Sequence, residues 1–168
     1  MSHAAVLLSL GANLGDRQAT LERAATLLRD EALGGEIRCS AVYETDPVGY
    51  REQPPFLNIA AAGETCLPPE ELHAVCRGIE RRLGRRERPR WHEREIDIDI
   101  LLYGGAVLAN ETLEIPHPRM TERRFVLEPA AEIAPEMPHP LAGKTLRELA
   151  AECADTSQVR RASVLFAK

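Results

Sequence analysis

Two aspartates separated by one residue, Asp97 and Asp99, form the most distinctive chemical pattern in the sequence. Apolar residues alternate with them, as expected of a β-strand with one buried face. Because residues two apart in a strand point to the same side, the two carboxylates should project together while Ile96, Ile98 and Ile100 enter a core. Paired carboxylates suit a hard cation such as Mg²⁺, which often completes its coordination with water and phosphate oxygens. The alternative is an edge strand with a solvated acidic face.

A strongly basic segment leads directly into this strand. Positions 77–94 carry eight arginines against three acids. Arginine offers planar, paired donors to phosphate oxygens, so arginines beside metal-binding carboxylates predict phosphoryl-type transfer. The single tryptophan, Trp91, lies in the same segment and could stack on a planar heterocycle or fold back onto the core. A flexible charged loop and an RNA contact patch are the alternatives for this segment.

Two further segments offer groups for a flat, polar ligand. His117 lies between two prolines on a rigid turn, where it could donate to a phosphate or play a structural part. A proline-rich loop at 46–55 precedes Phe56 and Asn58, a ring and an amide that could hold a planar ligand by stacking and edge hydrogen bonds. Neither segment identifies a ligand by itself.

The hydrophobic pattern predicts the elements that position these groups. Short apolar runs predict strands at 6–10, 37–45, 56–65 and 96–103. Helical spacing and start signals predict helices after Asp16, starting within Pro68–Glu71, at 124–133 and at 146–153. Val107–Leu108 is expected to pair with strand 96–103 as a hairpin, and 84–94 to form an exposed, mobile loop. The β-α-β-β-α-β order favours an α+β sandwich of ferredoxin-like topology, mainly antiparallel, with C-terminal additions.

Composition narrows the class of protein. The chain has 168 residues, of which 44% are hydrophobic and 28% charged, consistent with one domain spanning 1–168. No apolar run approaches the roughly 18 residues of a membrane span, and no secretory signal is visible, so a cytoplasmic protein without a membrane partner is expected. The net charge of −5 argues against a general nucleic-acid partner. Four widely spaced cysteines without a CxxC pair indicate reduced thiols.

Several segments together are similar to one enzyme family. They are Leu8–Asp16, Tyr43–Gly49, Gln53–Asn58, Arg94–Gly104, Ile115–Met120 and Arg123–Leu127. In combination they resemble 6-hydroxymethyl-7,8-dihydropterin pyrophosphokinase of folate biosynthesis, over nearly the whole chain. The resemblance implies a monomer with a ferredoxin-like fold, ATP as co-substrate, two Mg²⁺ ions and a pterin acceptor. It further implies transfer of the β,γ-pyrophosphoryl group of ATP to the 6-hydroxymethyl oxygen, with release of AMP.

The resemblance also implies roles for individual residues. Asp97 and Asp99 match the metal-binding carboxylates, and the catalytic set adds Arg85 and Arg94. The implied ATP site comprises Glu80, Arg85, Trp91, Arg94, Ile100, His117 and Arg123. The implied pterin pocket comprises Thr45, Asp46, Val48, Phe56, Asn58, Trp91 and Phe125, with Trp91 closing over it. Which of Arg85, Arg86 and Arg88 contacts phosphate stays open at this point.

The sequence departs from the family pattern at two places. His92-Glu93 follows the tryptophan where the family commonly has Gly-Pro, and Glu95 stands where it commonly has threonine. Glu95 has the parity of Asp97 and Asp99, so it could add a third carboxylate to that face. Two other functions remain compatible with the residues. One is an RNA-binding domain on the same kind of sandwich, and the other is a pterin or nucleotide sensor without catalysis.

Overall fold

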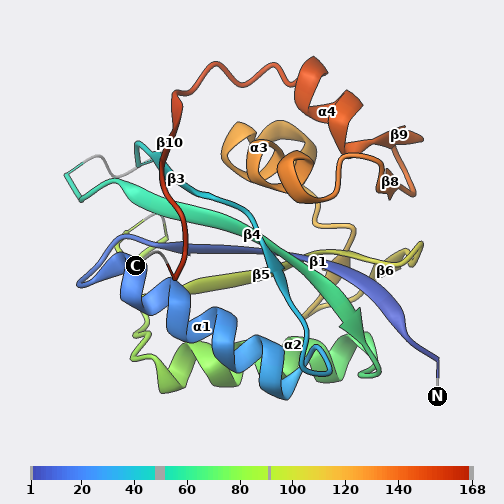
Figure 1. Cartoon of the computed structure of the whole chain (residues 1–168), viewed down its shortest axis with the longest axis horizontal. Helices are drawn as coiled ribbons and strands as arrows, with labels where there is room; N and C mark the ends of the chain where they lie inside the picture. The colour runs from blue at the N-terminus through green and yellow to red at the C-terminus, as the bar shows by residue number, and fades with distance from the viewer. Residues whose placement is uncertain (1, 48–51, 91, 167–168) are drawn as a thin grey trace.

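The computed structural model describes residues 2–47, 52–90 and 92–166 (Figure 1). Its main sheet is antiparallel and contains β1 (Ala4–Ala12), β2 (Arg38–Cys39), β3 (Val42–Thr45), β4 (Phe56–Thr65), β5 (Asp97–Tyr103) and β10 (Val159–Ser163). The helices are α1 (Arg17–Glu31), α2 (Pro69–Arg82), α3 (Arg124–Ile133) and α4 (Leu146–Glu152), with a 3₁₀ turn at Met120–Glu122. Two short hairpins complete the described chain: β6 (Leu108–Ala109) with β7 (Glu114–Ile115), and β8 (Pro138–His139) with β9 (Lys144–Thr145).

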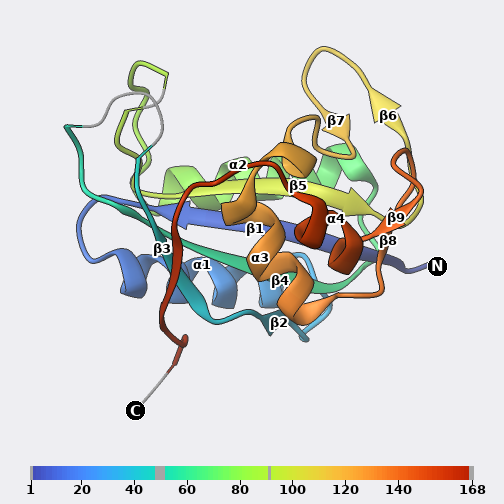
Figure 2. The same ribbon diagram turned by 90° about the horizontal axis from the view of Figure 1, so that it is seen from above.

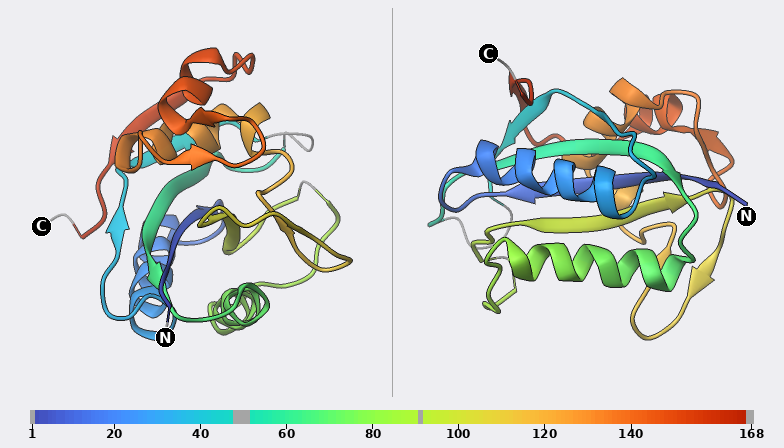
Figure 3. Two further views of the ribbon diagram at one scale, coloured as in Figure 1. Left: turned by 90° about the vertical axis from the view of Figure 1, so that its right-hand side faces the viewer. Right: turned by 60° about the horizontal axis from the view of Figure 1, so that its bottom comes forward.

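The strand order confirms the expected α+β architecture. The strands run β10-β3-β4-β1-β5, and β2 also pairs with β4. The inner order β3-β4-β1-β5, with α1 after β1 and α2 after β4, is the ferredoxin-like arrangement. Helices α1 and α2 lie side by side on one face of the sheet, and α3 and α4 lie on the other (Figures 1 and 3). Strand β5 is therefore an edge strand of the sheet.

Local signals place the helices as the sequence predicts. Helix α1 begins after Asp16, whose Oδ1 accepts a hydrogen bond from the Ala19 N–H at 3.1 Å. Helix α2 begins at Pro69, where the missing N–H costs nothing, and Glu70 and Glu71 favour the positive end of its dipole. These helices bury one stripe each against the alternate residues of β1 and β4, forming the larger core.

The opposite face of the sheet is covered only at one end. There α3 and α4 pack on Leu7, Ala60 and Leu101 and form a second, smaller core. Toward the other end of this face, the same alternation brings Asn58 and Asp97 to the surface that the helices leave open. This face of the sheet is therefore apolar where α3 and α4 cover it and polar at its open end.

Two predicted elements differ in the structure. Val107–Leu108 does not pair with β5; instead β6 pairs with β7 as a separate hairpin (Figure 2). The free edge of β5 is already occupied, because side chains of α2 bind the Ile98 backbone and the His117 N–H donates to the Leu101 carbonyl at 3.0 Å. A hairpin partner would have to displace these contacts.

The single strand predicted at 37–45 is two strands, β2 and β3. Both pair with β4, with Cys39 opposite Ala61 and Tyr43 opposite Asn58, so one extra residue lies between them. The Ser40 hydroxyl fills the gap, accepting from the Ala60 N–H at 2.9 Å and donating to the Ala41 carbonyl at 2.7 Å. The described part of the chain contains no helix of the length and apolarity that crossing a membrane requires.

The larger core should carry much of the stability. Leu8, at the centre of β1, is fully buried, so Leu8→Ala should lower the free energy of unfolding by about 2–5 kcal/mol through lost burial and a cavity. Leu141, which is 66% exposed, is the matched control, and Leu141→Ala should change stability by less than about 0.5 kcal/mol. Urea unfolding followed by circular dichroism measures both. Equal losses in the two variants would contradict the assignment of the core.

Candidate active site

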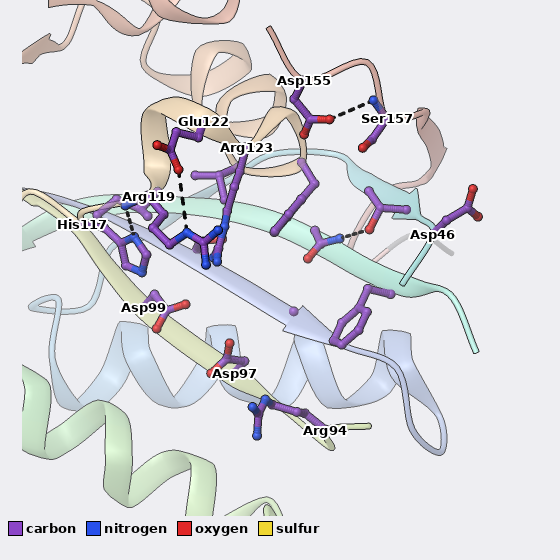
Figure 4. A pocket seen from close by; sticks show the side chains of 18 of the residues that line it. Asp46, Arg94, Asp97, Asp99, His117, Arg119, Glu122, Arg123, Asp155 and Ser157 are labelled. Atoms are coloured by element: carbon purple, nitrogen blue, oxygen red, sulfur yellow. Dashed lines mark hydrogen bonds and ion pairs between the residues drawn. The ribbon is translucent and has the colours of Figure 1, made fainter. Parts of the chain in front are cut away.

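The open end of the sheet face forms a pocket of about 500 Å³ (Figure 4). Strands β1, β4 and β5 form its floor, and the 117–126 region, β3 and the segment after α4 form its walls. Ten residues expected from the sequence line it: Thr45, Asp46, Phe56, Asn58, Arg94, Asp97, Asp99, His117, Arg123 and Phe125. The structure therefore gathers most of the expected site residues, from distant parts of the chain, around one cavity.

Asp97 and Asp99 project from β5 into this pocket on the same side, as their spacing predicts. Their partners on β1 are Gly11 and Ser9, two small residues that leave space above the carboxylates. Burial, and secondarily the negative charge of Asp97, raise the pKa of Asp99 to about 7. The two carboxylates thus form a concentration of negative charge that a bound cation would relieve.

A buried ion pair on α2 holds β5 at the residue between the two aspartates. Glu80 is 2% exposed, and its Oε2 accepts from the Ile98 N–H at 2.7 Å. Arg77 donates from Nη1 to Glu80 Oε1 at 2.7 Å and from Nη2 to the Ile98 carbonyl. Burial raises the pKa of Glu80, and the charge of Arg77 opposes that rise. Glu80 and Arg77 together satisfy both outward-facing backbone groups of Ile98, as a neighbouring strand would.

Arg85 and Arg88 lie against acidic side chains of the strand region. Arg85 Nη1 lies 2.8 Å from Glu80 Oε2 and 3.0 Å from Asp97 Oδ1. Arg88 grips Glu95 with two hydrogen bonds of 2.6 Å, which hold the pKa of Glu95 below its ordinary value. Of the three arginines left open by the sequence, Arg85 is the one seen beside an aspartate of the pocket. Glu95 is bound by Arg88 and does not line the pocket, so it does not add a third carboxylate beside Asp97 and Asp99.

The pocket also contains an amide and two aromatic rings. Asn58 is 4% exposed, and its Nδ2 donates to Thr45 Oγ1 at 2.8 Å. A Cβ at Gly11 would lie 2.8 Å from Asn58 Oδ1, so glycine is needed there for the amide to keep its place. Phe56 and Phe125 line the same pocket. An amide and two rings suit a flat heterocycle with hydrogen-bonding edges.

His117 is placed as a neutral donor. Its Nδ1 accepts from the Arg119 N–H at 3.2 Å, which leaves the proton of the neutral ring on Nε2. Burial, with a smaller contribution from Arg123, lowers the pKa of His117 below its ordinary value. His117 therefore lines the pocket as an uncharged imidazole that can donate one hydrogen bond from Nε2.

Five residues expected at the site lie elsewhere or outside the described chain. Ile100 is 4% exposed and belongs to the larger core, so its side chain does not face the pocket. Glu80 and Arg85 do not line the pocket. Arg85 contacts Asp97, which does, and Glu80 contacts Arg85. Val48 and Trp91 lie outside the described residues.

Sequence reasoning missed several residues that line the pocket. They are Ser9, Gly11, Arg90, His92, Leu101, Arg119, Glu122, Val126, Asp155 and Ser157. Most of them lie within or next to motifs that the sequence singles out, and parity in the first strand could have found Ser9 and Gly11. Asp155 and Ser157 belong to no motif, and only the path of the chain after α4 brings them here.

The residues present fit a magnesium ion that is shared with phosphate. Within residues 2–47, 52–90 and 92–166, no group of three or more His, Cys, Asp or Glu side chains is arranged to hold a metal. Asp97 and Asp99 supply two oxygen-bearing groups in one pocket. Mg²⁺ characteristically takes one or two carboxylates and completes its shell with water and substrate phosphates. The donor set therefore suits an ion that arrives with a phosphorylated substrate.

The known proteins that are similar in sequence to this chain include several that share one name. A family model described as 7,8-dihydro-6-hydroxymethylpterin-pyrophosphokinase matches residues 7–135. The 2-amino-4-hydroxy-6-hydroxymethyldihydropteridine pyrophosphokinase of Bacillus subtilis is 45% identical over 130 residues, covering 77% of this chain and 78% of its own length. The protein of the same name from Methylorubrum extorquens is 44% identical over 154 residues, covering 92% of this chain and 96% of its own.

Solved structures share the fold at lower sequence identity. A crystal structure of wild-type Plasmodium falciparum HPPK-DHPS with pterin and p-hydroxybenzoate matches with a TM-score of 0.70 and 19% identity. The match covers 90% of this chain and 43% of that one, so this chain spans less than half of the Plasmodium chain. The arrangement of helices around an antiparallel sheet is common to the two.

The raised pKa of Asp99 predicts a pH-dependent stability. Folding moves this pKa from 3.8 to about 7, so between these values the folded protein binds more protons than the unfolded one. The free energy of unfolding therefore falls as pH rises through that interval. Without metal, Asp99→Asn should raise the melting temperature at about pH 8 and leave it nearly unchanged at about pH 4.

The control for this measurement is Asp30→Asn. Asp30 pairs with Arg29 on the exposed surface of α1, with 53% of its side chain accessible. We expect it to change the melting temperature little at either pH, since exposed ion pairs contribute about 0–1 kcal/mol. A melting temperature of Asp99→Asn that tracks the wild type at both pH values would contradict the electrostatic account.

Proposed function

The chain belongs to the 7,8-dihydro-6-hydroxymethylpterin-pyrophosphokinase family and is an ATP-dependent pyrophosphokinase of folate biosynthesis, and we propose that the pocket over β5 is its active site. The reaction transfers pyrophosphate from ATP to the 6-hydroxymethyl group of 6-hydroxymethyl-7,8-dihydropterin and releases AMP. One observation carries the assignment of the site. The paired carboxylates of Asp97 and Asp99 share a single pocket with the amide and rings of Asn58, Phe56 and Phe125. One end suits a metal-bound triphosphate and the other a flat heterocycle.

The two carboxylates bear on the main electrostatic obstacle to the reaction, the negative charge of the triphosphate. The acceptor hydroxyl is a weak nucleophile, and the charges of the triphosphate oppose the approach of any electron-rich group. We propose that Asp97 and Asp99 hold two Mg²⁺ ions jointly with phosphate oxygens. Bound there, magnesium would neutralise phosphate charge and orient the triphosphate toward the acceptor. Burial and the negative charge of Asp97, which together raise the pKa of Asp99, support a cation at this place.

Arg85, Arg94 and Arg123 are proposed to bind the phosphates. Arg94 is anchored through its backbone, because its N–H donates to Asn13 Oδ1 at 2.8 Å and its carbonyl accepts from the Asn13 N–H at 3.1 Å. Asn13 is 1% exposed, so the end of the basic segment 77–94 is attached to the core while the Arg94 side chain lines the pocket. Arginines placed in this way can stabilise charge that builds on the transferring and departing oxygens.

The remaining nucleotide contacts follow from the same geometry. His117 can donate from Nε2 to a phosphate or to the base. Ile100 lies two residues beyond Ile98 on an edge strand, so its backbone, not its side chain, is the group that could meet a nucleotide. Glu80 acts through Arg85, which it holds beside Asp97. Trp91 stays in the proposal as the residue that closes over the substrates.

The pterin is proposed to bind at the Asn58 end. Thr45 fixes the Asn58 amide by a hydrogen bond of 2.8 Å, which leaves Oδ1 as an acceptor for the heterocycle edge. Phe56 and Phe125 supply faces for stacking, and Asp46 lines the same wall. Val48 completes the set carried over from the family resemblance.

We propose that residues 1–168 act as one pyrophosphokinase domain and as a monomer, in the cytoplasm, with small molecules as the only partners. All four cysteines are free, which suits a reducing compartment.

An RNA-binding function is disfavoured because Asp97 and Asp99 would repel a phosphate backbone at the pocket. A sensor without catalysis is separated from the enzyme by product formation. Release of AMP from ATP that depends on added hydroxymethyldihydropterin establishes the reaction, and pterin binding without AMP release would support the sensor.

The two aspartates should be indispensable for turnover. Asp97→Ala and Asp99→Ala each remove a proposed metal ligand, so AMP formation should fall more than about tenfold, equivalent to about 1.4 kcal/mol in the barrier. Affinity for the pterin alone, measured by calorimetry, should be nearly unchanged because Asn58 and the rings remain. Asp30→Ala serves as a surface control and should keep full activity. A pocket variant that retains more than a tenth of wild-type turnover would remove that residue from the metal site.

Asn58 should determine pterin affinity. Asn58→Ala leaves the polar edge of the ligand without its partner, so pterin binding should weaken by about 1–3 kcal/mol while binding of an ATP analogue is unchanged. The control is Asn110→Ala, which changes an asparagine of the β6–β7 turn that bonds its own loop. Calorimetry with hydroxymethylpterin and with the ATP analogue measures both affinities. Unaltered pterin affinity in Asn58→Ala would place the acceptor elsewhere.

A further inference from the structure

The segment between α4 and β10 crosses the rim of the pocket. We call residues 153–158 the strap. Asp155 and Ser157 of the strap line the pocket, on the side opposite Asp97 and Asp99 (Figure 4). The strap lies beyond residues 7–135, the part of the chain that the family model matches. Its contribution to the site therefore follows from the structure of this chain and not from the family pattern.

The strap supplies the N-terminal cap of α3. The residue that precedes this helix, Arg123, makes no side-chain capping hydrogen bond. Asp155 Oδ2 instead accepts from the backbone N–H of Arg124, the first helical residue, at 3.0 Å. Asp155 Oδ1 accepts from the Ser157 N–H at 2.9 Å, which orients the carboxylate. A side chain 31 positions away thus satisfies a helix-terminal donor that is normally capped by a neighbour in sequence.

The Arg124 side chain forms further hydrogen bonds between α3 and the strap. Its Nε donates to the Asp155 carbonyl at 2.7 Å, and its Nη2 donates to the Cys153 carbonyl at 3.3 Å. Its Nη1 meets Glu128 Oε1, one turn along α3, at 3.0 Å. Arg124 does not itself line the pocket. The strap and the start of α3 are therefore joined by several directional bonds outside the cavity.

The position of the helix start matters because its neighbours in sequence face the pocket. Arg123 and Phe125 flank Arg124, both line the cavity, and the Arg123 guanidinium lies 5.7 Å from the centre of the Phe125 ring. Beyond the strap, β10 pairs with β3, with Val159 opposite Thr45. The strap thus connects the wall that carries Phe125 to the wall that carries Thr45.

We propose that Asp155 is a positioning residue for the pterin end of the active site. By capping α3 it holds Phe125 at the distance from β3 that a flat heterocycle requires. This inference rests on the proposed function of the pocket. It predicts a larger effect on the pterin than on ATP, because Asp97, Asp99 and Arg94 lie outside the strap and α3. Of the three arginines proposed to bind phosphate, only Arg123 adjoins Arg124.

Steady-state kinetics of Asp155→Ala separates positioning from general stability. The Michaelis constant for hydroxymethyldihydropterin should rise about tenfold, while that for ATP, affected only through Arg123, should rise by no more than about threefold. Asp155→Asn keeps a carbonyl oxygen that can accept from the Arg124 N–H, so it should recover most of the wild-type value. The matched control is Thr156→Ala, an exposed neighbour on the same strap, which should behave as the wild type.

A second variant tests the strap without changing a pocket-lining side chain. Arg124→Gln removes the bonds to the strap carbonyls and retains the backbone N–H, so the pterin Michaelis constant should rise in the same direction by a smaller factor. This variant decides the question if Asp155→Ala does not fold. Calorimetry with hydroxymethylpterin, in the presence of a non-hydrolysable ATP analogue, should show the same order of affinities.

The outcomes distinguish this proposal from the proposed function. Absence of pterin-dependent AMP formation by the wild type would overturn the function itself. With an active wild type, an unchanged pterin Michaelis constant in both Asp155→Ala and Arg124→Gln would overturn the positioning role. Parallel losses for ATP and pterin, without recovery in Asp155→Asn, would also overturn it, because they indicate a general structural effect.

Discussion

The geometry of the site depends on the contacts of the buried Glu80 carboxylate with Arg77 and with the Ile98 backbone. It accepts hydrogen bonds from Arg77 and from the Ile98 N–H and forms an ion pair with Arg85, and Arg77 also donates to the Ile98 carbonyl. Charge-assisted hydrogen bonds of this kind contribute about 1.5–3 kcal/mol each, and loss of one partner from a buried pair costs about 3–5 kcal/mol. Because Ile98 lies between Asp97 and Asp99, the same contacts that seal the sheet edge also fix the spacing and direction of the two aspartates.

The charges of Asp97, Asp99 and Arg85 beside Ile98 favour a pocket with a bound ligand over an empty one. Asp97 and Asp99 lie close enough for burial and mutual repulsion to raise the pKa of Asp99 to about 7. Arg85 compensates part of that charge through its contact of 3.0 Å with Asp97. A site that concentrates like charges gives up stability in the absence of its ligand, as functional sites commonly do. A cation bound at the two carboxylates would relieve this repulsion.

The pocket exists because the second face of the sheet is covered only in part. Helices α3 and α4 bury Leu7 and Leu101 at one end, and small residues of β1 leave the other end open. The open end is bounded by segments that are distant in sequence and tied together by side chains, such as Asp155 at the start of α3. A rigid floor of strands with walls joined by such bonds suits a site that must hold two substrates in a fixed relation.

The sequence by itself determined the features that depend on local periodicity and on short motifs. The two-residue repeat of Asp97 and Asp99, the cap at Asp16 and the β-α-β-β-α-β succession along the chain are all visible there, and the motif combination pointed to the family. Only the tertiary structure decided which charges meet. Glu95 has the parity of a metal ligand but is bound by Arg88, and Val107–Leu108 cannot pair with β5 because α2 and the His117 turn occupy its edge. Periodicity reports which way a side chain points along its own element. The partner that it meets depends on which distant segment the fold brings opposite, and no local pattern encodes that.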